Sequence, residues 1–252
     1  MEDFTDRNKS ELNQKQILNK LFKQTNLDDF EKFRNFPVFT PRFNMARFLA
    51  HYEIFKKIYK LPGVIIDLGV YRGASSFTWA KLCEIFCPTD VKKKIFAFDT
   101  FKGFPNLNEN DIEKKELDIK KGGYNCGKNI LSDLELAQEA MNQDKFINHI
   151  NRIEFIKGNV INTIPKFCKE NNIKIALLNL DLDLYEPTKI ALENFEPLMV
   201  KNSIIILDEY ADNNFIGETK AVDEYFKKKY SSKPNLQKFF WHSNPSAYIK
   251  IK

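Results

Sequence analysis

Hydrophobic and polar positions along this chain change their spacing, and the change separates helices from strands. From Met45 onward, apolar residues recur at intervals of three and four, which is the spacing of one helix face. They are Phe48, Leu49, Tyr52, Phe55 and Tyr59. Pro62 and Gly63 end this pattern, so residues 1–61 are expected to form an N-terminal helical segment. Val64–Ile66 follows as a dense β-branched run, typical of a buried parallel strand.

The same change of period recurs down the chain. Further strand-like runs occur at Lys94–Phe98, Arg152–Ile156, Lys174–Leu180 and Ser203–Leu207. Helical patterns lie at Ala74–Phe86, Asp133–Asn142, Ile161–Glu170, Thr188–Leu198 and Glu218–Lys228. Strands that alternate with helices predict an α/β fold with βαβ units and a parallel sheet. Past Pro234, strand-like runs at Leu236–Trp241 and Ala247–Lys252 flank a hairpin signal at residues 242–245. The sheet is therefore expected to end in an antiparallel pair.

One stretch, residues 106–129, fits neither period. It is polar, and it contains Gly122, Gly123 and Gly127. A connection this long with little apolar content is either a disordered insertion or a lid over a functional site. We expect a single domain over residues 1–252, with the α/β core beginning at residue 62.

Composition excludes several classes of protein. The 252 residues carry 39 Lys plus Arg against 34 Asp plus Glu, so the excess of +5 is thin and does not indicate a nucleic-acid partner. No apolar run approaches the roughly 20 residues that a membrane helix needs. The N-terminus is polar and lacks the apolar region of a signal peptide, which favours a cytoplasmic location. The 23 Phe supply one large core, and the aromatic residues of 43–59 are expected to pack on the sheet or to form a dimer contact.

Histidine and cysteine are too few and too scattered for a metal site of those residues. The three His have no pair at ligand spacing, and none of the four Cys lies in a C-x-x-C. Any bound metal would have to be held mainly by carboxylates.

Ligands of open α/β sheets bind beyond the carboxyl ends of the strands, so the residues at those ends are the first candidates. The first strand runs into Asp67-Leu68-Gly69-Val70-Tyr71-Arg72-Gly73, a glycine turn directly before a helix. The second strand ends at Asp99, where a carboxylate either accepts a ribose hydroxyl pair or caps the next segment. This combination favours an adenosine-bearing ligand, although the third glycine of the dinucleotide fingerprint is absent.

Acidic residues follow the fourth and fifth strands. Asp181 and Asp183 come after the fourth strand, and Asp208 and Glu209 after the fifth. Four carboxylates at one sheet edge repel one another, and a divalent cation relieves that repulsion. Oxygen-only ligation suits Mg²⁺, Ca²⁺ or Mn²⁺, while helix caps and solvated acids are the simpler interpretation.

Five segments together resemble the macrocin-type (TylF/MycF-like) O-methyltransferases. They are GVIIDLGVYRGASSF, FAFDTFKGFP, FIKGNVINTIP, LLNLDLDLYEPT and IIILDEY. The resemblance covers about residues 40 to 230. It implies a class I methyltransferase (Rossmann-like) fold, whose seven-stranded sheet has helices on both faces and an antiparallel last strand. It also implies methyl transfer from S-adenosyl-L-methionine to a sugar hydroxyl, with Mg²⁺.

The resemblance also implies roles for particular residues. The turn around the methionine part of the cofactor would be formed by Asp67, Gly69 and Gly73, with Tyr71 and Ser75 beside it. Asp99 would hold the ribose, and Thr100, Phe101, Gly158, Asn159 and Val160 would border the adenine. Asp181 would be a cofactor contact, a metal ligand and the catalytic base, and Asp208 and Glu209 would complete the metal site. The acceptor would be a small sugar or sugar nucleotide, and the protein a homo-oligomer.

Two residues depart from the family pattern. Glu209 replaces an Asp, which puts the metal site in question, and Asn179 stands where a basic residue is common. Three other functions stay open at this point. Asp181-Leu182-Asp183 is also the D-x-D of a nucleotide-sugar glycosyltransferase, a nicotinamide oxidoreductase is a weaker alternative, and a non-catalytic methyltransferase-like protein is a third.

Overall fold

The structure, a computed structural model, describes residues 9–111 and 120–252. The chain divides into two compact units, Met1–Arg47 and Phe48–Lys252. Their boundary lies inside helix α4 (Arg42–Ile58).

The N-terminal unit is helical. It contains α1 (Lys9–Gln24), α2 (Asp29–Arg34) and α3 (Phe36–Phe39). Asp28 caps α2, because its Oδ1 accepts a hydrogen bond of 2.8 Å from the backbone N–H of Glu31. None of the residues of these three helices is buried.

The second unit is built on a seven-stranded sheet with the order β3-β2-β1-β4-β5-β7-β6. Its strands are β1 (Val64–Leu68), β2 (Ile95–Asp99), β3 (Ile153–Lys157), β4 (Ile175–Leu180), β5 (Met199–Leu207), β6 (Leu236–Gln237) and β7 (Ala247–Lys250). The first five strands pair in parallel, whereas β7 is antiparallel to both β5 and β6. The predicted fold class and its antiparallel ending are therefore confirmed.

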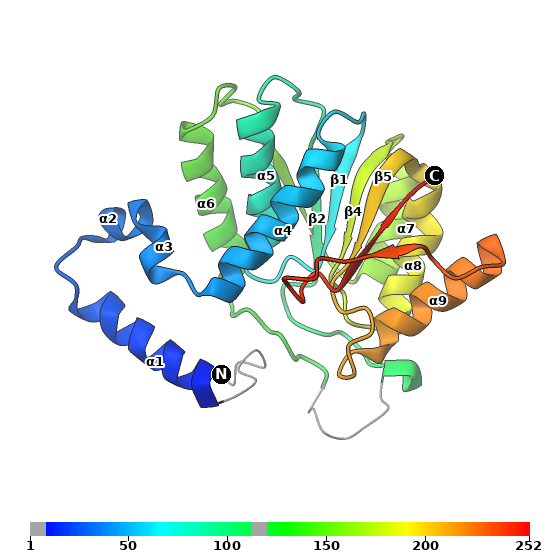
Figure 1. Cartoon of the computed structure of the whole chain (residues 1–252). Coiled ribbons are helices and arrows are strands. Elements are labelled where there is room, and N and C mark those ends of the chain that lie inside the picture. Colours follow the sequence, from blue (N-terminus) through cyan, green and yellow to red (C-terminus); the bar gives the residue numbers. More distant parts are fainter. Residues whose placement is uncertain (1–8, 112–119) are drawn as a thin grey trace. The chain divides into compact units, whose positions relative to one another are not determined.

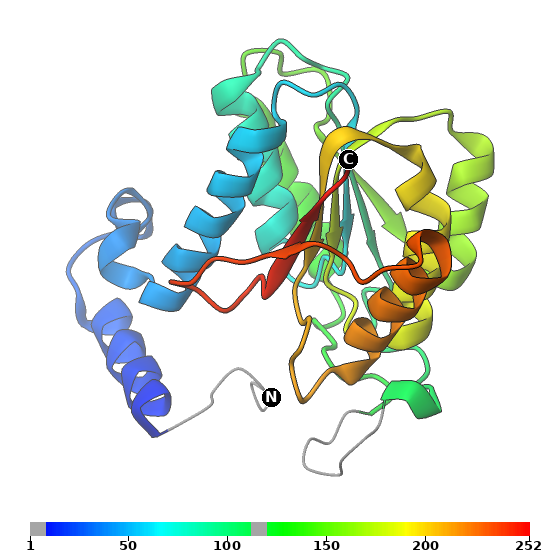
Figure 2. The same cartoon turned by 45° about the vertical axis from the view of Figure 1, so that its right-hand side comes forward.

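Helices cover both faces of this sheet (Figures 1 and 2). One face packs on α4, α5 (Ala74–Phe86) and α6 (Ile130–Gln143), and the other on α7 (Val160–Glu170), α8 (Tyr185–Phe195) and α9 (Ile216–Tyr230). Alternate strand residues supply the two cores. Ile66 and Leu68 point to the α7–α9 face, and Ile65 points to the α4–α6 face.

Element boundaries agree best where the apolar pattern is dense. The predicted helix Ala74–Phe86 matches α5 residue for residue, but the strand predicted at Leu236–Trp241 is paired only as far as Gln237. Phe240 is 92% exposed, so this apolar run belongs to no sheet beyond that residue. A run of apolar residues predicts a strand only if another strand is there to pair with it.

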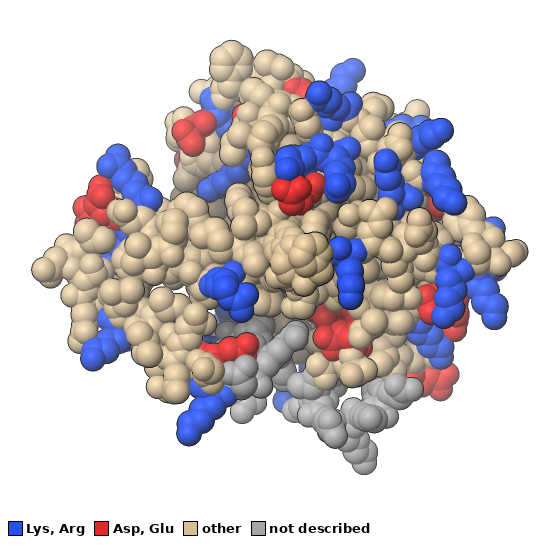
Figure 3. All heavy atoms as spheres, viewed as in Figure 1, with Lys and Arg blue, Asp and Glu red and all other residues tan. Residues whose placement is uncertain are grey.

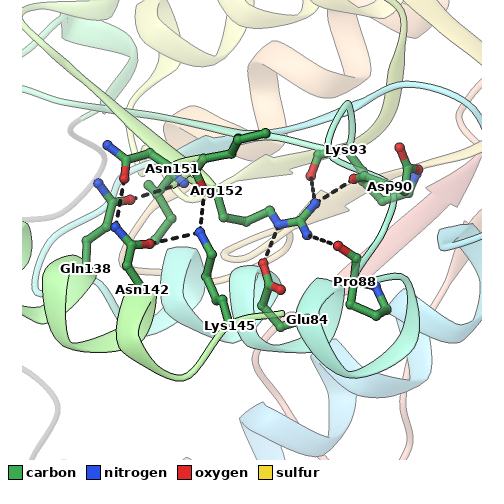
Figure 4. Close-up of polar contacts among 11 residues, drawn as sticks. Glu84, Pro88, Asp90, Lys93, Gln138, Asn142, Lys145, Asn151 and Arg152 are labelled. Carbon is green, nitrogen blue, oxygen red and sulfur yellow. Dashed lines mark hydrogen bonds and ion pairs between the residues drawn. The ribbon is translucent and has the colours of Figure 1, made fainter. Parts of the chain in front are cut away.

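The start of β3, an edge strand, is held by a buried arginine (Figure 4). Arg152 donates to the Glu84 carboxylate at 2.7 Å and to the carbonyl of Asp90 at 2.6 Å. It also donates to the carbonyls of Pro88 and Lys93. One side chain thus ties the strand to the end of α5 and to the loop that leads into β2.

Candidate active site

The carboxyl ends of the central strands lie in one row. Leu68 of β1 is in register with Leu180 of β4, which in turn is in register with Leu207 of β5. The residues that follow these strands therefore lie side by side. The Asp181 N–H donates to the Leu68 carbonyl, and the Asp208 N–H donates to the Leu180 carbonyl, both at 3.1 Å. The predicted convergence of the glycine turn and the acidic residues rests on this register.

Gly69 is required by the closeness of β1 and β4. Its φ is +86°, and a Cβ at this position would lie 1.7 Å from the carbonyl oxygen of Asp181. Gly73 also has φ +86° and is the N-cap of α5. Both glycines let the backbone turn sharply between β1 and α5. The N-terminus of α5 therefore lies at the carboxyl ends of the central strands.

Asp67 is fully buried under this turn, on the α4–α6 face. Its carboxylate accepts hydrogen bonds from the hydroxyls of Ser75 (2.8 Å) and Ser76, and from the Asn179 amide at 2.8 Å. Burial raises the pKa of Asp67, and these hydrogen bonds counteract that rise. In this structure Asp67 and Ser75 join the first turn of α5 to β1 and β4. They would therefore act on a ligand indirectly, by holding the glycine turn in position.

Asp99, the residue expected to hold a ribose, lies beside the glycine turn. Its Oδ2 accepts the Tyr71 N–H at 2.8 Å, and its Oδ1 accepts the Phe101 N–H at 2.6 Å. The Thr100 hydroxyl lies 3.4 Å from Oδ1 and donates to the Gly103 carbonyl at 2.7 Å. Each carboxylate oxygen has a second lone pair, which leaves acceptors for two ligand hydroxyls.

The predicted adenine-side residues follow β3 and β2. The Gly158 N–H donates to the Asp99 carbonyl at 2.9 Å, so the end of β3 lies against the end of β2. Asn159 caps α7 by accepting the Ile161 N–H at 3.1 Å. Val160 and Phe101 are both 5% exposed and pack into the cores on opposite faces of the sheet, so only small parts of them can border a ligand.

The acidic residues after β4 and β5 are held by a residue from the C-terminal segment. The Asn244 amide donates to Glu209 Oε1 at 3.1 Å and lies 3.4 Å from Asp208 Oδ2. The Ser246 hydroxyl donates to the Asp208 carbonyl at 2.7 Å. Asp208 itself is 1% exposed. The segment that precedes β7 therefore holds Asp208 and Glu209 in place through hydrogen bonds.

Glu218 adds a fifth carboxyl group that the sequence analysis did not identify. It is fully buried in the first turn of α9, and its Oε1 accepts the Glu209 N–H at 3.2 Å. Burial, followed by the charges of Asp208 and Asp183, raises the pKa of Glu218 well above its ordinary value. The sequence signal was only a Glu at the start of a predicted helix.

Part of the stretch 106–129 reaches the same place. The Tyr124 ring packs edge-on against Tyr71 and lies 6.2 Å from the Phe215 ring. Burial and the carboxylates of Asp183 and Glu209 raise the pKa of Tyr124. Residues 112–119 of this predicted lid lie outside the described residues, and closure of the remainder stays a prediction.

The carboxylates do not fit a metal ion as they are placed. Within residues 9–111 and 120–252, no three His, Cys, Asp or Glu side chains come together in a way that could hold one. Their chemistry suits Mg²⁺, but Asp208 and Glu209 are both directed to the Asn244 amide. The metal set Asp181, Asp208 and Glu209 is therefore adjacent in the fold without forming a site.

The strand order, the glycine turn after β1 and the acidic residue after β2 define the class I methyltransferase fold. The chain belongs to the macrocin O-methyltransferase (TylF) family, whose profile matches residues 44–241. The resemblance inferred from the sequence is thereby confirmed, and membership of a methyltransferase family implies S-adenosyl-L-methionine as the methyl donor.

Similar proteins include two from Streptomyces. One is 8-demethyl-8-(2,3-dimethoxy-alpha-L-rhamnosyl)-tetracenomycin-C 4'-O-methyltransferase of Streptomyces olivaceus. The chain is 26% identical to it over 151 residues, and this match covers 60% of the chain and 54% of that protein. The chain is 25% identical over 171 residues to demethyldecarbamoylnovobiocin O-methyltransferase of Streptomyces niveus, with coverages of 67% and 60%. The chain thus matches little more than half the length of these curated relatives.

Solved structures match over more of the chain. The calicheamicin methyltransferase CalS11 superposes with a TM-score of 0.87 and 29% identity, over 99% of this chain and 94% of that one. An apo structure of CalS11, described as a TDP-rhamnose 3'-O-methyltransferase, gives a TM-score of 0.79 and 28% identity over 99% and 96%. No helix among the described residues is long and apolar enough to cross a bilayer.

Proposed function

We propose that this protein is an S-adenosyl-L-methionine-dependent O-methyltransferase that acts on a hydroxyl group of a sugar. The observation that carries the proposal is the register of the strand ends, because Asp99 ends β2 on one side of the glycine turn after β1 and Asp181 follows β4 on the other side. Support for the sugar comes from relatives whose names give a rhamnosyl or TDP-rhamnose substrate. The acceptor would be a nucleotide-linked sugar or a glycan precursor of a natural product or cell surface.

The chain's own residues would position the two reactants and take up one proton. The bound cofactor supplies a methyl group on a positively charged sulfur, which leaves as a neutral thioether. Asp99 would hold the ribose hydroxyls, and the turn from Gly69 to Gly73 would admit the methionine part. Asp181 lies next to this turn. It would accept the proton of the sugar hydroxyl while the hydroxyl oxygen forms the new bond to the methyl carbon. Alignment of the reactants alone can contribute several kcal/mol.

Two binding experiments test the cofactor part. Calorimetry should show S-adenosylhomocysteine binding to the wild type, and Asp99→Ala should weaken it at least tenfold through loss of the ribose contacts. Thr89→Ala, on a loop away from the strand ends, is the control. Binding of a UDP- or GDP-sugar without S-adenosylhomocysteine would instead favour the D-x-D glycosyltransferase, against the family assignment.

The catalytic part is tested by mass spectrometry of products from a panel of nucleotide-activated sugars, beginning with TDP-rhamnose. We expect one product heavier by a methyl group, and a loss of about 10²–10⁴-fold in kcat for Asp181→Asn. Full activity of Asp181→Asn would remove Asp181 as the base. Cofactor binding without methylation of any acceptor in the panel would favour the non-catalytic alternative.

The use of Mg²⁺ by Asp181, Asp208 and Glu209 is a separate part of the proposal. It rests on their carboxylate chemistry and on their adjacent strand ends, and it requires the acidic pair to turn away from Asn244. Calorimetric titration of Mg²⁺ into the protein with bound S-adenosylhomocysteine tests it without relying on activity. Binding that is lost in Glu209→Gln supports the site, and no heat in the wild type, with activity retained in EDTA, contradicts it.

A further inference from the structure

A buried carboxylate in the second unit lies at the start of a helix that is distant from it in sequence. Acidic side chains are scattered over the face of the molecule seen in Figure 3, where water can solvate them. Asp111 differs, because only 4% of it is exposed. It ends the short helix η1 (Glu109–Asp111), in the polar connection that follows β2. A buried carboxylate is costly without hydrogen-bond donors, so its donors indicate its role.

Both oxygens of Asp111 accept hydrogen bonds from the backbone. Oδ1 accepts the N–H of Tyr185, the first residue of α8, at 2.6 Å, and Oδ2 accepts the N–H of Asn108 at 2.7 Å. The first N–H groups of a helix have no partner within the helix. Leu184, which precedes α8, has no polar side chain to supply one. Asp111 therefore caps α8 from 74 positions away, and its negative charge lies at the positive end of the helix dipole.

The first turn of α9 leaves room for this carboxylate. Gly217 is helical, so glycine is needed there for space: a Cβ would lie 2.3 Å from Asp111 Oδ1 and 2.6 Å from the Tyr185 nitrogen. The Lys220 ammonium also donates to Asn110 Oδ1 at 2.5 Å, which attaches η1 to the same helix. Figures 1 and 2 show η1 as a short green helix beside the first turns of α8 and α9. A larger residue at 217 would separate the carboxylate from α8.

The N–H that Asp111 binds comes directly after the turn that carries two acidic residues of the candidate site. Residues 181–184 connect β4 to α8, and Asp183 among them has a left-handed φ of +63°. The beginning of this turn is fixed because the Asp181 N–H donates to a carbonyl of β1. Its end is fixed because the Tyr185 N–H donates to Asp111. A residue other than glycine keeps a left-handed conformation only where its surroundings hold it, so both attachments matter.

We propose that Asp111 is a positioning residue for methyl transfer, which holds the start of α8 and thereby fixes residues 181–184 and the carboxylate of Asp181. This inference rests on the proposed function, in which Asp181 accepts the proton of the sugar hydroxyl. Without the bond to Asp111, the first turn of α8 and the residues before it are free to shift. A displacement of about 1 Å in a group that acts on the reacting atoms can lower the rate about 100-fold. Asp111 thus acts on the reaction through Asp181, without contact to the acceptor.

Steady-state kinetics on a sugar acceptor compare Asp111→Ala with Glu196→Gln. Glu196 is the matched control, because it is also a carboxylate that is 4% exposed and hydrogen-bonded. It lies at the opposite end of α8, about 16 Å away along the helix. We expect Asp111→Ala to lower kcat about 10- to 100-fold and Glu196→Gln to change it less than about twofold. An unchanged kcat in Asp111→Ala, or an equal loss in the control, overturns the proposal.

Two further variants separate the hydrogen bond from folding. Asp111→Asn keeps an oxygen that can accept the Tyr185 N–H, so it should recover most of the kcat that Asp111→Ala loses. Gly217→Ala keeps the carboxylate but displaces it from α8, so it should lower kcat as Asp111→Ala does. Circular dichroism and the melting temperature show whether each variant is folded. A folded Asp111→Asn with kcat as low as that of Asp111→Ala contradicts the role of this hydrogen bond.

Hydrogen exchange followed by mass spectrometry tests the same contact without an acceptor. In Asp111→Ala, the peptide that covers residues 181–186 should exchange about tenfold faster than in the wild type, whereas Glu196→Gln should leave it unchanged. Unchanged exchange in Asp111→Ala overturns the proposal even if the wild type methylates a sugar. A wild type that methylates no sugar, with the expected increase in exchange, contradicts the proposed function and supports the hold of Asp111 on residues 181–184.

Discussion

The two units of this chain use apolar residues in opposite ways. The helices α1–α3 bury none of their residues, whereas every residue of β1 and β4 is buried. Both regions form regular secondary structure. The difference shows that periodicity identifies the element, while burial depends on whether another element of the same chain covers its apolar face.

Mutations should act differently in the two units. In the second unit, side chains and backbone are fixed by neighbours distant in sequence, so single changes there should cost much free energy of unfolding. In the N-terminal unit the same type of change should alter only local order or association. Four changes test this contrast.

The largest effect is expected at Gly69. Gly69→Ala combines a left-handed φ with a Cβ placed 1.7 Å from the Asp181 carbonyl oxygen, which forces the ends of β1 and β4 apart. We expect a loss of about 3–5 kcal/mol in the free energy of unfolding, together with loss of cofactor binding. Urea denaturation and calorimetry measure these two quantities.

Gly122→Ala is the control for backbone strain alone. Its φ is +79°, close to that of Gly69, but a Cβ there meets nothing within 4 Å. It should cost about 1–2 kcal/mol. Equal losses in the two variants would show that strain, and not the approach of β4, is what requires glycine after β1.

The second effect concerns the buried Arg152. Arg152→Met leaves the Glu84 carboxylate without its cation and removes donors from the carbonyls of Asp90 and Pro88. The expected cost is about 3–5 kcal/mol, as for other buried pairs that lose one partner. Lys166→Met breaks an exposed pair with Glu170 at 3.9 Å and should cost less than about 0.5 kcal/mol. A small loss in the free energy of unfolding for Arg152→Met would mean that the hydrogen bonds of the guanidinium only offset the cost of its burial.

Arg152 and Glu218 also show where prediction from sequence ended. The strands were predictable because their β-branched runs are local, and the convergence at the strand ends followed from the parallel sheet. Arg152 bonds to residues about 60 positions away, and Glu218 approaches the carboxylates through the packing of α9. Such partners are set by tertiary packing, which leaves no periodic signal in the chain.

The same reason explains the acidic pair. The sequence predicts Asp208 and Glu209 at the end of the fifth strand, but their contact with Asn244 depends on a segment about 35 residues later, where the sequence indicates only a hairpin turn. The predicted metal site was thus an inference about positions, whereas ligation depends on side-chain directions that positions alone do not determine.

The third prediction concerns the pH dependence of stability. Burial by itself would raise the pKa of Glu196, but hydrogen bonds from Lys229, Tyr230 and Tyr225 outweigh it and lower that pKa below the ordinary 4.5. Because the pKa of Glu196 is lower in the folded than in the unfolded protein, its ionised carboxylate stabilises the fold above about pH 4.5. This stabilisation is lost as the pH falls through the pKa of the folded state. Glu196→Gln should therefore cost about 2 kcal/mol at pH 7 and progressively less as the pH falls below 4.5.

Urea denaturation at a series of pH values measures this difference. Glu31→Gln, in the exposed pair with Arg34, is the matched change in the N-terminal unit and should leave the profile of the core unchanged. A cost for Glu196→Gln that is constant from pH 3 to pH 7 would show that the network stabilises through packing and not through charge.

The smallest effect separates the two units with identical chemistry. Asp28 caps α2 through the Glu31 N–H at 2.8 Å, and Asn159 caps α7 through the Ile161 N–H at 3.1 Å. Replacement of either residue by Ala removes one capping bond, worth about 1 kcal/mol. In α7, which packs on the sheet, the loss should lower the free energy of global unfolding. In α2, which buries nothing, it should instead speed hydrogen exchange of the α2 amides about fivefold and leave the melting of the core unchanged. If Asp28→Ala lowers the melting temperature of the core as much as Asn159→Ala, the two units unfold together and the contrast between them is wrong.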